Sequence, residues 1–152
     1  MSALAELKEG IIYASIEIDA PPEAVWDAMT EPAQLASWWG SSDTYRTMNW
    51  QVDLRPGGKW SSDSANVDGS QTGHVHGEYL EVDRPRLLVY TWRASWDNFA
   101  ETLIRVELSP ASSGTRVTIR HSGFAERSAS GAGHAEGWKR VLGWLSGHAA
   151  LR

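Results

Sequence analysis

Residues 133–149 read GHAEGWKRVLGWLSGHA, and this stretch decides the fold. Its large apolar side chains recur at intervals of three and four residues, the spacing that places them on one face of an α-helix. The apolar face consists of Trp138, Val141, Leu142, Leu145 and Ala149. Most of the remaining chain has strand-like patterns, and an amphipathic helix must bury its apolar face against another element. We therefore expect one long helix packed against a sheet, with the functional site in the space between them.

Glycines interrupt this helix at Gly137 and Gly143, and each lowers helix stability by about 1 kcal/mol relative to alanine. Either close packing or bending at the site would explain them. Trp138 lies near the start of the helix and is expected in a pocket wall. Leu142 and Leu145 are expected in the core.

The stretches before the helix alternate apolar and polar residues, as strands with one buried face do. The first is Ile11 to Ile18. Further strands are expected at residues 50–54, 59–62, 74–82, 86–94, 101–108 and 115–123. The polar stretches at residues 40–47, 63–73 and 124–133 are expected to be loops. Strands joined by short turns indicate an antiparallel meander.

Two proline-led turns follow the first expected strand. Residues 20–23 (APPE) and the pair Glu31-Pro32 place proline in the first turn of a helix, where its missing N–H leaves no bond unmade. The sequence therefore predicts two short helices, of which the second carries Leu35, Trp38 and Trp39.

The composition excludes several classes of protein. The 152 residues are expected to form one domain, residues 1–152. A net charge of −5 argues against nucleic acid or an anionic membrane as the main partner. The absence of cysteine excludes disulfides and thiolate chemistry. Because the sequence shows neither a signal peptide nor a bilayer-spanning apolar run, we expect a cytoplasmic protein. We expect it to be a monomer or a homodimer.

The common catalytic motifs are missing from the sequence. There is no G-x-S-x-G and no H-E-x-x-H. Residues 131–137 (GAGHAEG) resemble a dinucleotide-binding loop, but the third glycine is one position late and the context is not βαβ, so we interpret them as a flexible helix entry. We expect no cofactor and no metal.

Two groups of polar residues remain candidates. His74, His76 and Glu78 alternate along one strand and share a face. They could ligate a metal, act as an acid–base set, anchor a ligand from the pocket wall, or lie on a solvated outer face.

His121 is in phase with apolar residues of its strand and is expected to face the helix. It is either a hydrogen-bonded core residue or a polar group of the pocket. His121, paired with a carboxylate such as Glu78, is the weak catalytic candidate, because a histidine pKa lies near neutrality.

Aromatic residues are the strongest functional indication, with nine tryptophans against two phenylalanines. Ligand pockets are mostly apolar and carry a few placed polar groups. These rings either line such a pocket or fill the core. The candidate ligand-binding residues are Trp38, Trp39, Trp60, His76, Tyr90, Trp92, Trp96, Phe99, His121, Phe124 and Trp138.

Four ordered motifs support a family resemblance. They are IDAPPEAVWDAMTEPAQLASWWG (18–40), RPGGKW (55–60), GEYLEVDRPRLLVYTW (77–92) and GTRVTIRHSGF (114–124). With the helix that follows, they resemble bacterial proteins similar to the activator of Hsp90 ATPase, within the START/Bet v 1-like (SRPBCC) superfamily. The resemblance does not include the separate N-terminal domain of the eukaryotic co-chaperone.

The resemblance implies an α+β helix-grip fold. A curved antiparallel sheet of about six to seven strands would surround the long C-terminal helix, with two short helices after the first strand. It also implies an apolar cavity between sheet and helix.

Three functions follow as hypotheses from the resemblance and the residues. The first is binding of a small hydrophobic or aromatic ligand, such as a lipid, and we rank it first because no complete catalytic set is visible. The second is a polyketide cyclase or hydrolase-like enzyme that uses His121 and a pocket carboxylate. The third is a stress-response module that binds Hsp90 or another protein.

Overall fold

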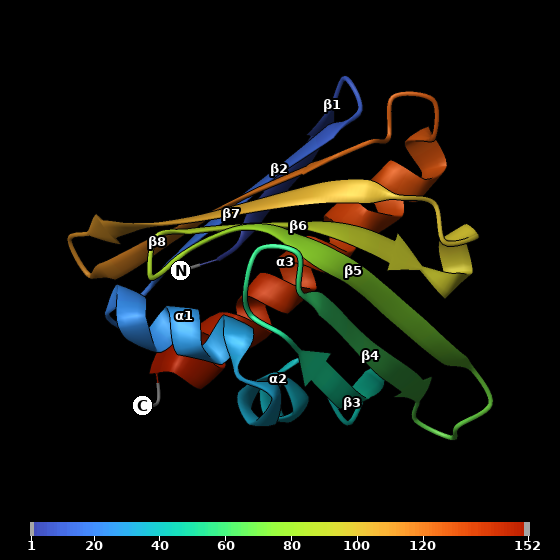
Figure 1. The fold of residues 1–152 in the computed structure, drawn as a ribbon, viewed down its shortest axis with the longest axis horizontal. Coiled ribbons are helices and arrows are strands. Elements are labelled where there is room, and N and C mark those ends of the chain that lie inside the picture. The colour runs from blue at the N-terminus through green and yellow to red at the C-terminus, as the bar shows by residue number, and fades with distance from the viewer. Residues whose placement is uncertain (1, 151–152) are drawn as a thin grey trace.

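Residues 2–150 are described by a computed structural model, in which eight strands form one antiparallel sheet (Figure 1). The strand order is β1-β2-β8-β7-β6-β5-β4-β3. The strands are β1 (Leu4–Lys8), β2 (Ile11–Ile18), β3 (Tyr45–Val52), β4 (Lys59–Asn66), β5 (Thr72–Asp83), β6 (Leu87–Ala94), β7 (Thr102–Ala111) and β8 (Gly114–Ser122). The predicted α+β helix-grip class is confirmed, although the sheet has more strands than the six to seven expected.

The helices are α1 (Pro22–Thr30), α2 (Pro32–Trp38) and α3 (Ser128–Ala150), and a 3-10 turn, η1 (Ser95–Asp97), follows β6. Proline stands in the first turn of both α1 and α2, as predicted. These two helices carry the chain from β2 to β3 at the far edge of the sheet, and α1 packs against α3 (Figure 1). Among the described residues, no helix combines the length and apolar character needed to cross a bilayer.

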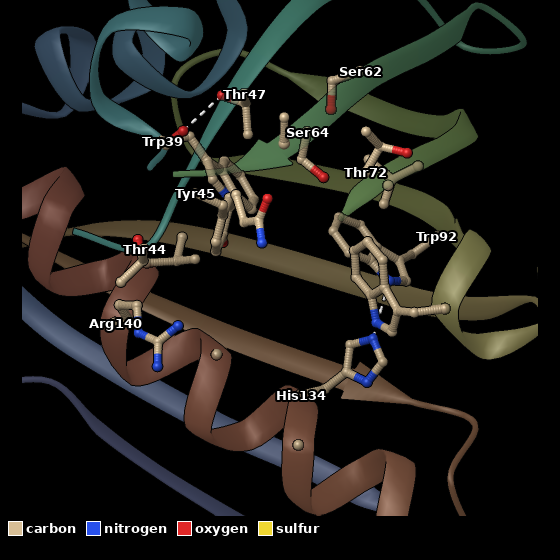
Figure 2. Close-up of a pocket in the computed structure, with 18 of the residues that line it drawn as sticks. Trp39, Thr44, Tyr45, Thr47, Ser62, Ser64, Thr72, Trp92, His134 and Arg140 are labelled. Carbon is tan, nitrogen blue, oxygen red and sulfur yellow. Dashed lines mark hydrogen bonds between the residues drawn. The ribbon is translucent and has the colours of Figure 1, made fainter. Parts of the chain in front are cut away.

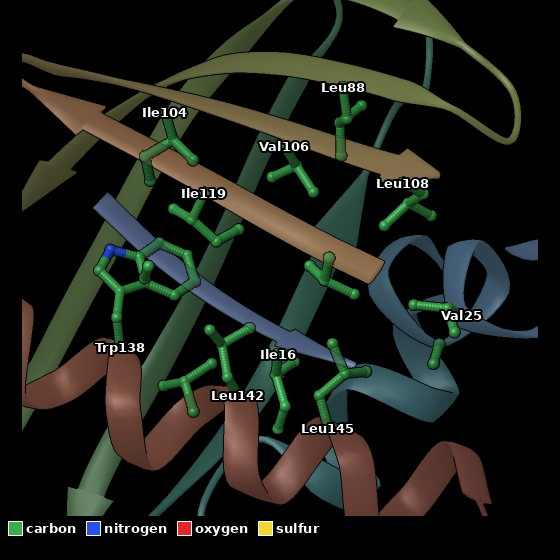
Figure 3. Close-up of a cluster of buried hydrophobic side chains, with 14 of the residues drawn as sticks. Ile16, Val25, Leu88, Ile104, Val106, Leu108, Ile119, Trp138, Leu142 and Leu145 are labelled. Carbon is green, nitrogen blue, oxygen red and sulfur yellow. The ribbon is translucent and has the colours of Figure 1, made fainter. Parts of the chain in front are cut away.

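The core lies between α3 and the concave face of the sheet (Figure 3). The predicted apolar stripe of α3 is buried along its whole length. It meets the inward residues of β2, β7 and β8, which are Ile12, Ile16, Ile104, Val106, Val117 and Ile119. Alternation along each strand puts these side chains on one face, so the sequence pattern and the core agree.

Irregularities in strand pairing bend the other half of the sheet. The register between β3 and β4 shifts between Met48 and Gln51, and the register between β5 and β6 shifts between Tyr79 and Glu81. Bulges of this kind kink a strand and increase its twist. The β3–β5 arm extends away from the strands that pack on α3 (Figure 1).

The additional strand is β1, which the sequence analysis did not predict. It pairs with β2 at one edge of the sheet. Its alternation is weak because Leu4 is 69% exposed, and Ala5 and Leu7 are only half-buried. Pairing with β2, rather than a pattern in its own sequence, therefore stabilises β1 as a strand.

Three predicted loops were partly wrong. Strand β3 begins at Tyr45, within the expected 40–47 loop, and ends at Val52. Strand β4 continues to Asn66 and strand β5 begins at Thr72, so both strands extend into the expected 63–73 loop. Polar residues occupy these strand ends, and the ladder between β4 and β5 satisfies their backbone groups.

Helix α3 begins at Ser128 rather than after the expected 124–133 loop. The first turns are rich in serine and glycine, which have low helix propensity. Tertiary packing compensates, because Gly131 is buried against Leu7 and Phe124. The residues that resemble a dinucleotide-binding loop are therefore part of the helix.

Candidate ligand-binding pocket

A cavity of about 530 Å3 lies between α3 and the β3–β5 arm (Figure 2). Pockets that bind small molecules have volumes of roughly 300–1,000 Å3. Helix α3 contributes Gly133, His134, Gly137, Trp138, Arg140 and Val141 to its lining. The cavity therefore occupies the place that the sequence analysis assigned to the functional site.

Tryptophan rings form most of the apolar wall. Trp39 is central, with its ring centroid 5.5 Å from that of Trp50 and 6.3 Å from those of Trp92 and Trp138. Trp96 lies at the pocket edge, 6.4 Å from Trp92, and is 60% exposed. Offset and tilted contacts at these distances are favourable between aromatic rings.

Three indole N–H groups of this wall, those of Trp50, Trp92 and Trp138, are bonded to other side chains of the protein. Trp50 donates to Thr47 Oγ1 at 3.0 Å, and Trp138 donates to His121 Nδ1 at 3.0 Å. Trp92 donates to Nε2 of His134, on α3, at 3.2 Å. These rings consequently offer apolar faces to the cavity rather than hydrogen-bond donors.

His121 lines the cavity with a side chain that is fully buried, and both of its ring nitrogens are hydrogen-bonded. An indole N–H can only donate, so Nδ1 accepts from Trp138 and the ring carries its proton on Nε2. The Nε2 atom lies 2.7 Å from Thr102 Oγ1, and the Thr102 hydroxyl donates to the Trp92 carbonyl at 3.2 Å. Burial lowers the pKa of His121 well below its ordinary value of 6.5, so the ring is neutral at physiological pH.

His134 is the histidine that reaches the pocket from α3. Its Nδ1–H donates to the Ser130 carbonyl at 2.9 Å, and its Nε2 accepts from Trp92. The ring stacks on Trp96 with centroids 6.4 Å apart. Together these residues close one end of the pocket (Figure 2).

The β3–β5 arm supplies a polar wall opposite α3. Its hydroxyl and amide side chains are Thr44, Thr47, Ser62, Ser64, Asn66, Gln71 and Thr72. Arg140 and Thr44 lie at the end away from Trp92 (Figure 2). Among residues 2–150, no aspartate, glutamate or lysine lines the cavity. Arg140 is the one lysine, arginine or acidic residue in this part of the lining.

A protein-family model described as "Activator of Hsp90 ATPase homolog 1-like protein" matches residues 19–149. The chain belongs to this family. Its fold is that of the SRPBCC/Bet v 1-like superfamily, as the motifs indicated. No curated protein is significantly similar to the chain in sequence.

Solved structures share the fold over nearly the whole length. A protein from Rhodobacter sphaeroides superposes with a TM-score of 0.87 at 18% identity, over 100% of both chains. The AHSA1 protein from Silicibacter pomeroyi gives 0.79 at 26% identity, over 93% of this chain and 98% of that chain. An AHSA1-like protein from Aeromonas hydrophila gives 0.75 at 25% identity, over 91% and 90% of the two chains.

In this AHSA1-like fold, part of the predicted aromatic set meets at the cavity. The predicted residues that line it are Trp39, Trp92, Trp96, His121 and Trp138. They come from the residue after α2 and from β6, η1, β8 and α3, which are distant in sequence. As predicted, Trp138 lines the pocket, while Leu142 and Leu145 are fully buried core residues.

Four predicted aromatic residues lie in the core behind the wall. Trp38, Trp60, Tyr90 and Phe124 are at most 7% exposed and are not among the lining residues. Trp60 supports the wall, with its ring 5.6 Å from Trp92. The interpretation of aromatic rings as core residues therefore applies to these four positions.

His76, Phe99 and Glu78 are not brought to the cavity. His76 and Glu78 alternate with the buried Val75 and Tyr79 on β5, and so lie on the outer face of the sheet. Glu78 is bonded to Lys59 at 3.2 Å across the β4–β5 ladder.

The neighbouring outer-face residues are paired locally. The His76 ring packs 5.6 Å from Phe99, and His74 is bonded to Asp63 at 2.7 Å. In the part of the chain that the structure describes, no group of three such side chains is placed to hold a metal ion.

Several lining residues were not predicted. Tyr45 and Trp50 come from β3, whose start was interpreted as a loop. His134 lies inside the predicted helix, one turn before Trp138 and therefore on the same face, but a search for apolar residues along that face does not select a histidine. The strand hydroxyls carry no sequence signal of their own, because serine and threonine are also common in loops.

Proposed function

We propose that this protein binds a small hydrophobic or aromatic molecule in the cavity between α3 and the β3–β5 arm. The observation that carries the proposal is an unfilled space walled by tryptophan faces, among which Trp50, Trp92 and Trp138 have their N–H groups bonded within the protein. A flat apolar ligand would remove these faces from water, and each favourable ring pair adds about 0.5–1.5 kcal/mol beyond area burial. The hydroxyl wall would orient the polar edge of such a ligand.

Intrinsic tryptophan fluorescence provides the test. Trp39, Trp50, Trp92 and Trp138 contact the cavity, so titration with a panel of apolar and aromatic compounds should quench and shift the emission. The variant Gly137→Leu places a side chain in the cavity and should remove most of the response. Gly143→Leu on the exposed side of α3 is the matched control and should respond as the wild type does. An unchanged spectrum up to high micromolar concentrations of every compound would contradict the proposal.

Binding has more support than cyclase or hydrolase chemistry with His121 and Glu78. Glu78 lies on the opposite face of the sheet from the cavity, and both ring nitrogens of His121 are occupied. A general base needs a free nitrogen within reach of the substrate proton. Unchanged turnover of a bound candidate substrate in His121→Gln would remove this residue from any such reaction.

The name of the family supports a second candidate, association with Hsp90 in a cytoplasmic stress response. A pull-down with purified Hsp90 should then recover the chaperone. Gly137→Leu should retain this association if it uses the surface rather than the cavity, and an empty pull-down would argue against the candidate.

A further inference from the structure

We infer that the ligand is an elongated aromatic monocarboxylate about 10 Å long, lying along α3 over Gly133 and Gly137 with its carboxylate at Arg140. This inference rests on the proposed binding function and names the class of ligand. Four features carry it: the charge at one end of the cavity, the bare helix surface beneath it, the spacing between its two ends, and the aromatic wall above it.

The positive charge at one end of the cavity is that of the Arg140 guanidinium, which a ligand could contact. Arg140 lines the cavity, and none of the described carboxylates forms an ion pair with it. Tyr45 lines the same cavity. Burial raises the pKa of Tyr45, while the positive charge of Arg140 acts on that pKa in the opposite direction. A guanidinium without an acidic partner, in a site lined by no acid among residues 2–150, favours an anionic group on the ligand.

The helix beneath the cavity lacks side chains at two positions. A Cβ atom built on Gly133 or Gly137 would meet no atom within 4 Å. Close packing therefore does not explain these glycines, although it explains Gly131, whose Cβ would lie 2.9 Å from Leu7. Glycine disfavours a helix relative to alanine, so the two positions keep open a space at a cost in stability.

The spacing of these residues defines a path along the helix. Gly133, Gly137 and Arg140 follow one another at intervals of four and three residues and so lie on one face of α3. Seven residues of helix extend about 10 Å, roughly the length of two linked aromatic rings with a carboxylate. Trp92 and His134 bound the far end of this path (Figure 2).

The wall above the path suits flat rings. Trp39 and Trp92 are nearly parallel, with an interplanar angle of 17° and centroids 6.3 Å apart. These nearly parallel ring faces favour aromatic over polar surface. An elongated aromatic molecule with one terminal anionic group therefore matches the tryptophan wall, the open surface of α3 and the charge of Arg140.

The test uses two probes of the same shape, biphenyl-4-carboxylate and the neutral biphenyl-4-carboxamide. Fluorescence titrations compare the wild type, Arg140→Gln and Lys139→Gln. Lys139 is the adjacent cation, bonded to Glu136 at 3.3 Å and absent from the cavity lining, so it controls for the loss of one positive charge on α3. Benzoate tests the length of the path.

The expected result is that the wild type binds the acid more tightly than the amide by about five- to tenfold, as a partly solvated charged hydrogen bond to arginine would give. Arg140→Gln should lose this preference and bind the amide normally, whereas Lys139→Gln should keep it. Added salt should weaken binding of the acid alone, and benzoate should bind more weakly than the biphenyl acid. Thermal melts of each variant confirm that it is folded.

Equal affinity for acid and amide in the wild type, or an unaltered preference in Arg140→Gln, would overturn the carboxylate assignment while leaving apolar binding intact. An equal loss of both probes in Arg140→Gln would also overturn it, because the arginine would then only shape the cavity. Benzoate binding as tightly as the biphenyl acid would overturn the length assignment. If neither probe nor any apolar compound bound the wild type, both this inference and the proposed function would fail.

Discussion

The two halves of α3 face the same sheet but are packed differently. In the C-terminal half, Leu142 and Leu145 are completely buried against the inner residues of β2, β7 and β8 (Figure 3). In the N-terminal half, Gly133 and Gly137 lie beside an open cavity. One helix thus provides stability at one end and space at the other.

The curvature of the sheet accounts for the difference. Strands β2, β7 and β8 lie close to α3, while the bulged β3–β5 arm extends away from the helix (Figure 1). Protein interiors are close-packed, so an unfilled cavity costs stability that other contacts must supply. The dense half of α3 supplies those contacts.

The largest expected effect comes from the dense half. Leu142→Ala should lower the free energy of unfolding by about 2–5 kcal/mol, because it removes a fully buried side chain and leaves a cavity. Urea unfolding provides the measurement. Leu103→Ala on β7 is the control, since Leu103 is 39% exposed and should lose much less. Similar losses in both variants would contradict the placement of Leu142 in a densely packed core.

The free energy of unfolding is expected to depend on pH because of His121, which is bonded to Trp138 on α3. Burial holds the pKa of His121 well below 6.5, so the unfolded chain takes up a proton there more readily than the folded chain does. The stability that His121 contributes is therefore complete above about pH 6.5 and is lost as the pH falls toward the folded pKa, by up to about 1.4 kcal/mol per pH unit.

Urea unfolding between pH 7.5 and about 5 checks this slope. His121→Gln keeps an acceptor for Trp138 and a donor for Thr102 but cannot titrate in this range, so its slope should be flatter. His76→Gln on the outer face should keep most of the wild-type slope. A wild-type slope that His121→Gln leaves unchanged would assign the proton uptake to other groups.

The smallest effects distinguish the glycines of α3. Gly137→Ala should raise the free energy of unfolding by about 0.5–1 kcal/mol, because alanine favours the helix and its Cβ meets no neighbour. Gly143→Ala should do the same, and it should leave ligand binding unchanged. Gly131→Ala should be less stable than both, because its Cβ would lie 2.9 Å from the Leu7 side chain and 3.1 Å from Phe124 Cβ, and these neighbours must shift.

Thermal melts of the three variants measure this order. A destabilised Gly137→Ala variant would show that the cavity floor is packed more tightly than the structure describes. It would also weaken the interpretation of these glycines as open space for a ligand.

Most of the fold could be predicted from local patterns. The stripe of α3, the alternation of Ile11 to Ile18 and the prolines of α1 and α2 each follow from a periodicity or a backbone constraint that acts within a few residues. Strand β1 and the first turns of α3 could not be predicted, because their own patterns are weak and their partners stabilise them. The polar ends of β4 and β5 resembled a loop for the same reason.

The site was only partly predictable. His76 and Glu78 were candidates, yet the pleat of β5 directs them outward, and a change of one residue in phase would have reversed this. Trp60 and Trp92 lie on inward faces, but only Trp92 reaches the cavity, since Trp60 lies behind it. The alternation of residues along a strand distinguishes inward from outward side chains, but it does not show whether an inward side chain reaches the cavity or lies in the core behind it.

The sequence by itself determined the α+β class, the family, the long helix and its buried stripe, because these depend on periodicity and on ordered motifs. Only the tertiary structure decided that Gly133, Gly137 and Arg140 share a cavity with Trp39 and Trp92. The physical reason is that a cavity is the space that packing leaves unfilled. It depends on how the β3–β5 arm bends relative to α3, and no single segment of the chain records that geometry.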